Sequence, residues 1–118
     1  MGTVYEFICE SCGYQARVCG GRDRGFYAIV ETMICHDCCE LVDVPVGDTR
    51  SPAVKLLKGE IEIEEFRKLM PEYEAKNKER FGHCPQCKGM NVSRWEDSQL
   101  CPKCGGHMIR GKFLAYWD

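Results

Sequence analysis

Eight of the ten cysteines in this chain of 118 residues fall into four Cys-x-x-Cys pairs. A two-residue gap lets a tight turn aim two sulfurs at one ion, and it directs backbone N–H groups at those sulfurs, which spreads the thiolate charge. Four pairs supply the ligands of two four-coordinate sites, and zinc favours four thiolates in a tetrahedron. We therefore predict two Zn²⁺ ions, with these ligands: Cys9, Cys12, Cys35, Cys38, Cys84, Cys87, Cys101 and Cys104.

A disulfide framework is the alternative use for so many cysteines. The first residues lack the basic segment and the apolar stretch of a secretion signal, and thiols stay reduced in the cytosol. We therefore expect a cytoplasmic protein whose thiolates bind metal. The longest uncharged apolar run, at 26–30, is too short to cross a membrane, so no membrane partner is expected.

The pairs in the second half of the chain follow a regular pattern. C-P-Q-C at 84–87 and C-P-K-C at 101–104 are separated by 13 residues, and glycine follows each pair closely. Proline sets the turn, and glycine tolerates a positive φ. Two such pairs resemble a zinc ribbon, which implies a structural zinc held by a small β-ribbon.

The first half is less regular. C-E-S-C-G-Y at 9–14 resembles the opening of rubredoxin-like and zinc-ribbon proteins, whereas C-H-D-C-C at 35–39 has no proline. Cys39 stands where glycine is usual, so the fourth ligand is open between Cys38 and Cys39. The rubredoxin-like resemblance also implies an alternative function, an iron electron carrier.

The pairing of the four turns follows from loop lengths. Joining the first pair to the second closes 22 residues, and joining the third to the fourth closes 13. Shorter loops lose less entropy on closure, so we predict sequential pairing. A cross-braced order, which joins the first pair to the third, is the alternative.

These expectations define the fold class, a small metal-bound α+β protein with two zinc β-ribbons and a helical insert. The N-terminal ribbon covers 1–50, the helical insert 51–82 and the C-terminal ribbon 83–118. Runs at 4–8, 14–18, 26–34 and 41–46 are β-prone, and the tail at 112–118 can add a strand.

The insert contains no cysteine and carries helix signals. Ser51 is a good N-cap with Pro52 at the first helical position, and Gly59 follows the end of that helix. Apolar residues at 63, 66 and 70 then share one helical face. Pro71 is predicted to break a continuous helix there. This apolar stripe docks on a ribbon or, if it stays exposed, supports a homodimer.

The formal charge of −2 excludes a strongly basic protein held to nucleic acid by bulk electrostatics. Residues 1–50 carry a net −4 and residues 84–118 a net +2. The C-terminal segment does mix basic and aromatic residues, as single-strand binders do. The overall acidity instead favours a packing role for both tryptophans, so nucleic acid is the disfavoured alternative. The residues concerned are Arg94, Trp95, Arg110, Lys112, Phe113, Tyr116 and Trp117.

No catalytic set stands out beside the cysteines. A closed four-thiolate site has no open coordination position for water or substrate. We therefore expect a non-enzymatic zinc protein with an interaction or regulatory role and a protein partner. Cys19 and Cys39 are expected to be small, partly buried residues, with reactive thiols as the alternative. The three histidines (His36, His83 and His107) are expected to lie outside the ligand sets.

Overall fold

Two antiparallel sheets and a helical hairpin make up the computed structural model, which describes residues 2–95 and 99–117. Sheet A has the order β2 (Gln15–Val18), β1 (Gly2–Cys9), β7 (Met108–Trp117). Sheet B has the order β3 (Arg22–Arg24), β4 (Ala28–Cys35), β5 (Glu40–Asp48). The short β6 (Val92–Arg94) also pairs with β4.

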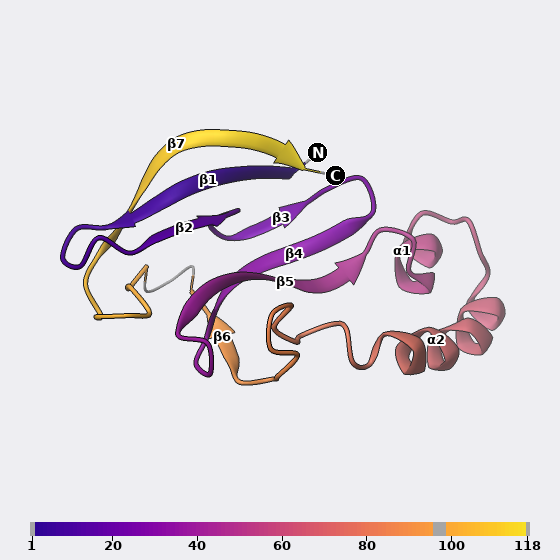
Figure 1. Cartoon of the computed structure of the whole chain (residues 1–118). Coiled ribbons are helices and arrows are strands. Elements are labelled where there is room, and N and C mark those ends of the chain that lie inside the picture. Colours follow the sequence, from indigo (N-terminus) through magenta and orange to yellow (C-terminus); the bar gives the residue numbers. More distant parts are fainter. Residues whose placement is uncertain (1, 96–98, 118) are drawn as a thin grey trace.

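The two ends of the chain lie side by side in sheet A (Figure 1). β1 pairs with β7 from Gly2 opposite Trp117 to Cys9 opposite Met108. The strand predicted for the tail is therefore confirmed as far as Trp117, and Asp118 lies outside the described residues. Sheet A thus combines strands from both predicted ribbons, and so does sheet B through the pairing of β6 with β4.

The main core lies between the two sheets. Phe7 and Met108 from sheet A pack with Leu41 of β5 and with Trp95, which is fully buried. The Phe7 and Trp95 rings meet edge to face, with centroids 5.1 Å apart. Trp95 therefore has the packing role that the acidic composition predicted.

A second, smaller cluster covers the opposite face of sheet B. Val42 and Val44 of β5 pack there with Cys35 and Cys84. Alternation along β5 explains the division, since Leu41 faces sheet A while its neighbour Val42 faces away. Each core cluster includes two of the predicted ligand cysteines.

Local signals predicted most of the insert correctly. α1 (Pro52–Leu57) begins at Ser51, whose side chain accepts a hydrogen bond from the N–H of Val54 at 3.3 Å. α2 (Ile63–Asn77) is continuous, so the predicted break at Pro71 is wrong. Pro71 removes one donor from the helix, but it is solvent-exposed, and water can bond the carbonyl group left unpaired.

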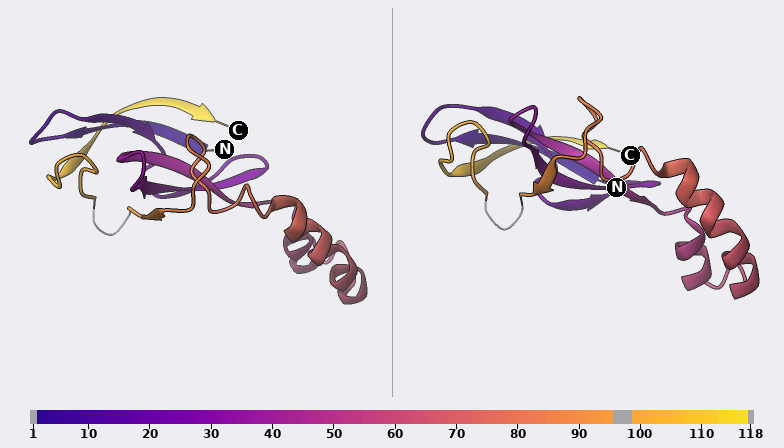
Figure 2. Two further views of the ribbon diagram at one scale, coloured as in Figure 1. Left: turned by 60° about the horizontal axis from the view of Figure 1, so that its bottom comes forward. Right: turned by 90° about the horizontal axis from the view of Figure 1, so that it is seen from below.

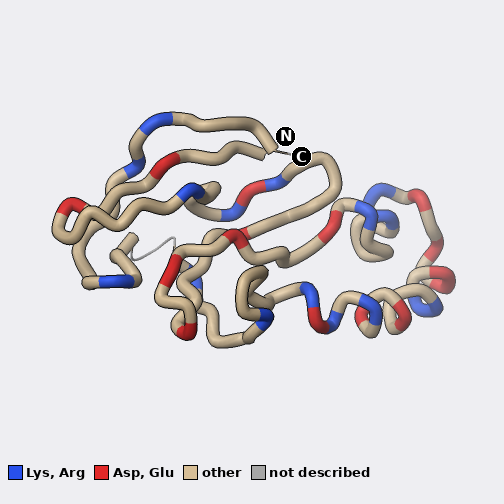
Figure 3. The backbone as a smooth tube through the Cα atoms, in the orientation of Figure 1, with Lys and Arg blue, Asp and Glu red and all other residues tan. Residues whose placement is uncertain are grey.

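The helical hairpin of α1 and α2 extends from one end of the sheets (Figure 2). The molecule is accordingly elongated, with extents of 53 × 27 × 21 Å. α2 has no buried residue, and its charges are of both signs (Figure 3). Ile63 is 47% exposed and Leu57 is 87% exposed. The predicted apolar stripe is therefore only partly covered by the chain itself.

Candidate metal centres

The eight predicted ligand cysteines form two groups of four. Site A consists of Cys9, Cys12, Cys101 and Cys104, and site B of Cys35, Cys38, Cys84 and Cys87. Within each group all four sulfurs lie within 4.8 Å of one another. All ten cysteines of the chain are free thiols.

The sequential pairing predicted from loop lengths is wrong, and so is the cross-braced alternative. The first pair joins the fourth, and the second joins the third, in a nested order. Residues 13–100 form a loop four times as long as the 22 residues expected, but two doublings of length cost only about 1.2 kcal/mol. The pairing of β1 with β7 brings Cys9 directly opposite Met108 and outweighs that cost.

Two tight turns position the ligands of site A. The first joins β1 to β2, where the N–H of Cys9 donates to the carbonyl of Tyr14 at 2.8 Å. The second repeats this geometry, since the N–H of Cys101 donates to the carbonyl of Gly106 at 2.7 Å. The first cysteine of each turn is buried and the second is exposed. Each turn is thus anchored in the core by one sulfur-bearing residue.

Two equivalent turns hold site B. One joins β4 to β5, with Cys35 opposite Glu40 in the ladder. In the other, the N–H of Cys84 donates to the carbonyl of Gly89 at 2.9 Å. Cys35 and Cys84 are both fully buried in the second core cluster. One buried cysteine in each turn therefore fixes the position of this site as well.

All four turns place the residue after the second cysteine in the left-handed region. In site A these residues are Gly13 (φ 80°) and Gly105 (φ 78°). In site B they are Cys39 (φ 54°) and Lys88 (φ 64°), which have side chains and so adopt this conformation at a cost. The missing glycine at Cys39 is evident in the sequence, whereas at 84–87 the glycine expected in this conformation, Gly89, stands one residue further along and Lys88 takes its place.

The sulfur geometry fits a tetrahedral thiolate site. Zn–S bonds near 2.3 Å place neighbouring sulfurs about 3.8 Å apart. In site A the Sγ atoms of Cys9 and Cys104 are 3.5 Å apart, and in site B those of Cys35 and Cys87 are 3.6 Å apart. The remaining close pair in site B, Cys38 and Cys84, is separated by 4.0 Å. Either group could hold one thiophilic cation with a complete set of four ligands.

Backbone N–H groups point at the sulfurs, as the short gap in each pair predicts. The N–H group of Cys12, aided by that of Ser11, lowers the pKa of the Cys9 thiol to about 6. Burial raises the pKa of Cys84, but the N–H groups of Cys87 and Gln86 outweigh it and lower that pKa to about 7. Each site thus has one thiol that ionises near neutral pH.

Cys38 of site B and Cys104 of site A, by contrast, resist ionisation while no cation is bound. Hydrogen bonding with Cys87 and burial raise the pKa of Cys38 to about 12. A divalent ion would remove this obstacle, because its charge favours the thiolate form of every ligand. Metal binding is therefore expected to release protons from both sites.

Basic side chains surround site B. A groove of about 350 Å³ beside Cys84 is lined by Lys76, Arg80, His83 and Lys88, with one acidic residue, Glu79. Four thiolates and one divalent ion carry a net charge of about −2. Lys76 and Lys88 are placed to offset part of that charge.

The structure also answers the question between Cys38 and Cys39. Cys38 belongs to site B, whereas Cys39 is exposed and lies within 3.5 Å of the carbonyl of His36. Cys39 is therefore more open than the partly buried position expected. Cys19 is partly buried, and its thiol donates to Asp43 at 3.3 Å. In the described part of the chain, neither sulfur group includes a histidine.

Comparison of this chain with protein-family models, curated proteins and solved structures finds no match. No helix among the described residues is both long and apolar enough to span a membrane. The two sulfur sites and the surfaces around them are therefore the features of this chain that bear on its function.

Proposed function

We propose that the chain is a non-enzymatic zinc protein, in which two structural Zn²⁺ ions hold together a scaffold for binding other molecules. The observation that carries this proposal is the completeness of each ligand set, with four sulfurs within 4.8 Å of one another. A site with four protein ligands has no position left for water or substrate, so it stabilises a fold rather than catalysing a reaction. The free thiols suit a reducing compartment such as the cytoplasm.

Elemental analysis of the purified chain tests the identity of the metal. We expect two zinc ions per chain and a colourless protein. A visible absorption band that bleaches reversibly on reduction would instead favour the rubredoxin-like alternative, an iron electron carrier. Fewer than two bound metal ions per chain after zinc reconstitution would contradict the proposal itself.

A protein partner is the binding role that the helical hairpin supports. Its side chains at Leu57 and Ile63 are exposed, and α2 has no buried residue. Exposed apolar side chains on one element favour a contact surface. A second copy of the chain is the simplest occupant, so light scattering of the zinc-loaded protein should give a dimer mass. Leu57→Glu is then expected to return it to a monomer without loss of zinc.

Single-stranded nucleic acid is the second candidate, and one group of side chains favours it. Phe113 (46% exposed) and Tyr116 (65% exposed) lie on β7 with ring centroids 4.9 Å apart. The ring centroids of Tyr5 and Phe113 are 6.0 Å apart, and the Arg110 guanidinium lies 4.9 Å from the centroid of the Tyr5 ring. Bases stack on such rings while a cation pairs with phosphate. Salt-dependent binding of a short oligonucleotide, lost in Tyr116→Ala, would support this candidate.

A further inference from the structure

A cleft of about 370 Å³ separates the helical hairpin from the end of sheet B. Its walls are mainly apolar, with Ile29 and Val46 on the sheet side and Val54, Met70 and Phe81 on the hairpin side. None of the eight ligand cysteines lines it. Small-molecule sites are typically apolar hollows of roughly 300–1,000 Å³ with a few convergent polar groups. This cleft therefore has the size and the surface of a ligand site.

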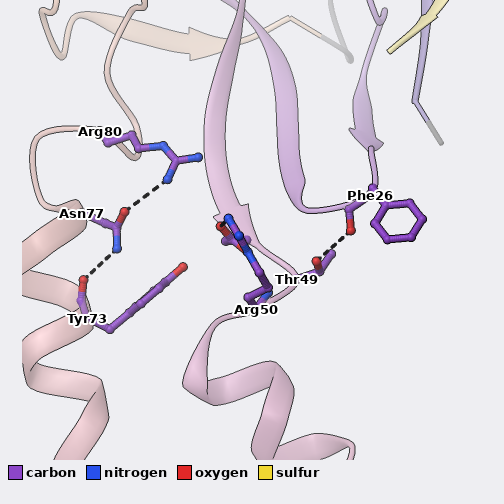
Figure 4. Close-up of polar contacts among 7 residues, drawn as sticks. Phe26, Thr49, Arg50, Tyr73, Asn77 and Arg80 are labelled. Carbon is purple, nitrogen blue, oxygen red and sulfur yellow. Dashed lines mark hydrogen bonds and ion pairs between the residues drawn. The ribbon is translucent and has the colours of Figure 1, made fainter. Parts of the chain in front are cut away.

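One polar atom in this cleft lacks a partner. The hydroxyl oxygen of Tyr73 is buried and has no hydrogen-bond partner among the described residues. Figure 4 shows the Tyr73 side chain reaching from α2 toward the end of β5, where Arg50 follows. A buried hydroxyl group without a partner destabilises the fold, and a ligand that accepts its hydrogen bond would relieve that cost. Burial also raises the pKa of Tyr73, so the hydroxyl group keeps its proton and can donate it to an acceptor.

The cleft is lined by two carboxylates, Asp48 and Glu74, and by one lysine, Lys78, while Arg80 lies beside it and acts on Asp48 and Tyr73 through its charge. Asp48 is already engaged by Arg50, whose backbone N–H donates to it at 2.7 Å and whose guanidinium donates to it at 3.1 Å. The Arg80 guanidinium donates to the side-chain oxygen of Asn77 at 3.4 Å and lies over the ring of Phe81, and its charge adds to that of Arg50 in lowering the pKa of Asp48. No ion pair of Arg80 is found within residues 2–95 and 99–117. Figure 4 shows its guanidinium extending from the end of the hairpin toward β5.

From these observations we propose that the cleft binds a small apolar carboxylate. The carboxylate accepts a hydrogen bond from the Tyr73 hydroxyl group and pairs with Arg80, which suits the preference of guanidinium for carboxylate. The apolar body lies against Met70 and Val54. This site is separate from the metal centres, so the proposal does not depend on the identity of the metal.

Octanoate is a suitable probe, with octanol and octylamine as neutral and cationic analogues of the same chain length. The metal-loaded full chain would carry ¹³C-methyl methionine, which gives one signal for each of its five methionines. We expect octanoate to shift the Met70 signal in a saturable way while Met33 and Met108, in the sheets, stay unchanged. Octanol should bind more weakly than octanoate, and octylamine should not bind.

Two variants with matched controls test the assigned contacts. Tyr73→Phe removes only the hydroxyl group and is expected to weaken octanoate binding about tenfold, whereas Tyr116→Phe, on β7, should leave it unchanged. Arg80→Gln should weaken octanoate binding about tenfold and octanol binding hardly at all. Arg67→Gln, an exposed change on α2, is the control for Arg80, which lies in the turn after that helix.

The proposal is overturned if octanoate leaves the Met70 signal unchanged at millimolar concentration, or if octylamine shifts it equally. It is also overturned if Tyr73→Phe and Tyr116→Phe bind octanoate alike. Thermal unfolding of each metal-loaded variant checks that the hairpin is intact. Met70→Trp provides a further test, since the larger ring should fill the cleft and abolish octanoate binding measured by calorimetry.

Discussion

Sites A and B use the same four-sulfur chemistry on turns of different quality. Both turns of site A have glycine in the left-handed position, at Gly13 and Gly105, whereas site B has Cys39 and Lys88 there. A side chain in this region costs about 1–2 kcal/mol. Site B therefore forms in spite of local strain, and site A forms on turns that suit it.

The two sites also close different parts of the chain. Site A ties the turn after β1 to the segment before β7, so it locks the strands that carry the two chain ends. Site B ties the turn between β4 and β5 to residues 84–87, so it closes the base of the helical insert. The strands β4 and β5 are already joined by a short turn, but β1 and β7 have no such connection. The fold should therefore depend more on site A.

The largest expected effect comes from removing one buried ligand from each site in turn. A structural zinc contributes an apparent 10–16 kcal/mol, roughly as much as the whole stability of a typical domain. Cys101→Ser should lose one zinc and release β7, so that its amides exchange rapidly with solvent. Cys84→Ser should also lose one zinc, but it should release mainly the insert and leave the ladder of β4 and β5 protected.

Hydrogen exchange and zinc analysis of both variants measure this contrast. Cys39→Ser is the matched control, because it removes a cysteine outside both sites and should retain two zinc ions. Equal loss of protection in β7 from Cys84→Ser and Cys101→Ser would contradict the inference that site A, and not site B, holds β7 in place.

A smaller effect is expected at the residue that braces site A from within the core. Trp95 is fully buried, and its indole N–H donates to the carbonyl of Leu100 at 2.8 Å, next to the ligand Cys101. Trp95→Ala should cost about 3–5 kcal/mol of unfolding free energy. It should also speed the transfer of zinc from site A to a chelator more than from site B. Equal transfer rates from both sites would contradict a local bracing role.

Spacing alone identified the eight sulfurs that the structure brings together, because a Cys-x-x-Cys turn is a local feature. The longer strands and the first helix were also predicted, since alternation in β5 and the Ser51–Pro52 signal act over a few residues, whereas the three-residue strands β3 and β6 were not. Pairing between turns is not local. It depends on which strands meet, and β1 meets β7 across almost the whole chain, which no short pattern encodes.

The other errors have the same physical origin. Pro71 breaks a helix when its lost hydrogen bond is buried, and the sequence does not reveal that this turn of α2 faces solvent. The cleft beside Tyr73 was likewise not predicted, since its lining residues have no distinctive spacing and are brought together only by the hairpin. Residues that act through tertiary contacts leave little trace in one sequence.

A third connection between the sheets uses a cysteine without metal, and its effect should appear at alkaline pH. Cys19 donates through its backbone N–H and its thiol to Asp43, which also accepts a bond from Thr32 at 2.6 Å. Burial and the charge of Asp43 raise the pKa of the Cys19 thiol above its ordinary value of 9.0. Because the pKa is higher in the folded state, the stability that the protonated Cys19 thiol adds to the fold is complete below pH 9. This stability is lost as the pH rises further.

Unfolding of the zinc-loaded protein at pH 8–10.5 tests this connection. Above about pH 9, the titration of Cys19 should lower the free energy of unfolding. The decline should be less than about 1.4 kcal/mol per pH unit, because the Cys19 side chain is partly exposed. Cys19→Ser should flatten this decline, whereas Cys39→Ser should preserve it. An unchanged slope in Cys19→Ser would assign the alkaline sensitivity to the metal sites instead.

The smallest effect is a direct exchange of the turn residues that distinguish the two sites. Lys88→Gly should relieve the left-handed strain in site B and raise the free energy of unfolding by about 1 kcal/mol. Gly105→Lys should lower it by a similar amount, and no atom lies within 4 Å of the Cβ it would add, so the loss would be conformational rather than steric. Denaturant unfolding of the zinc-loaded variants measures both. If Lys88→Gly proves destabilising, then the stabilising charge of the Lys88 ammonium group near the thiolates of site B is larger than the cost of its backbone strain. The difference in stability between the two sites would then come from charge and not from turn geometry.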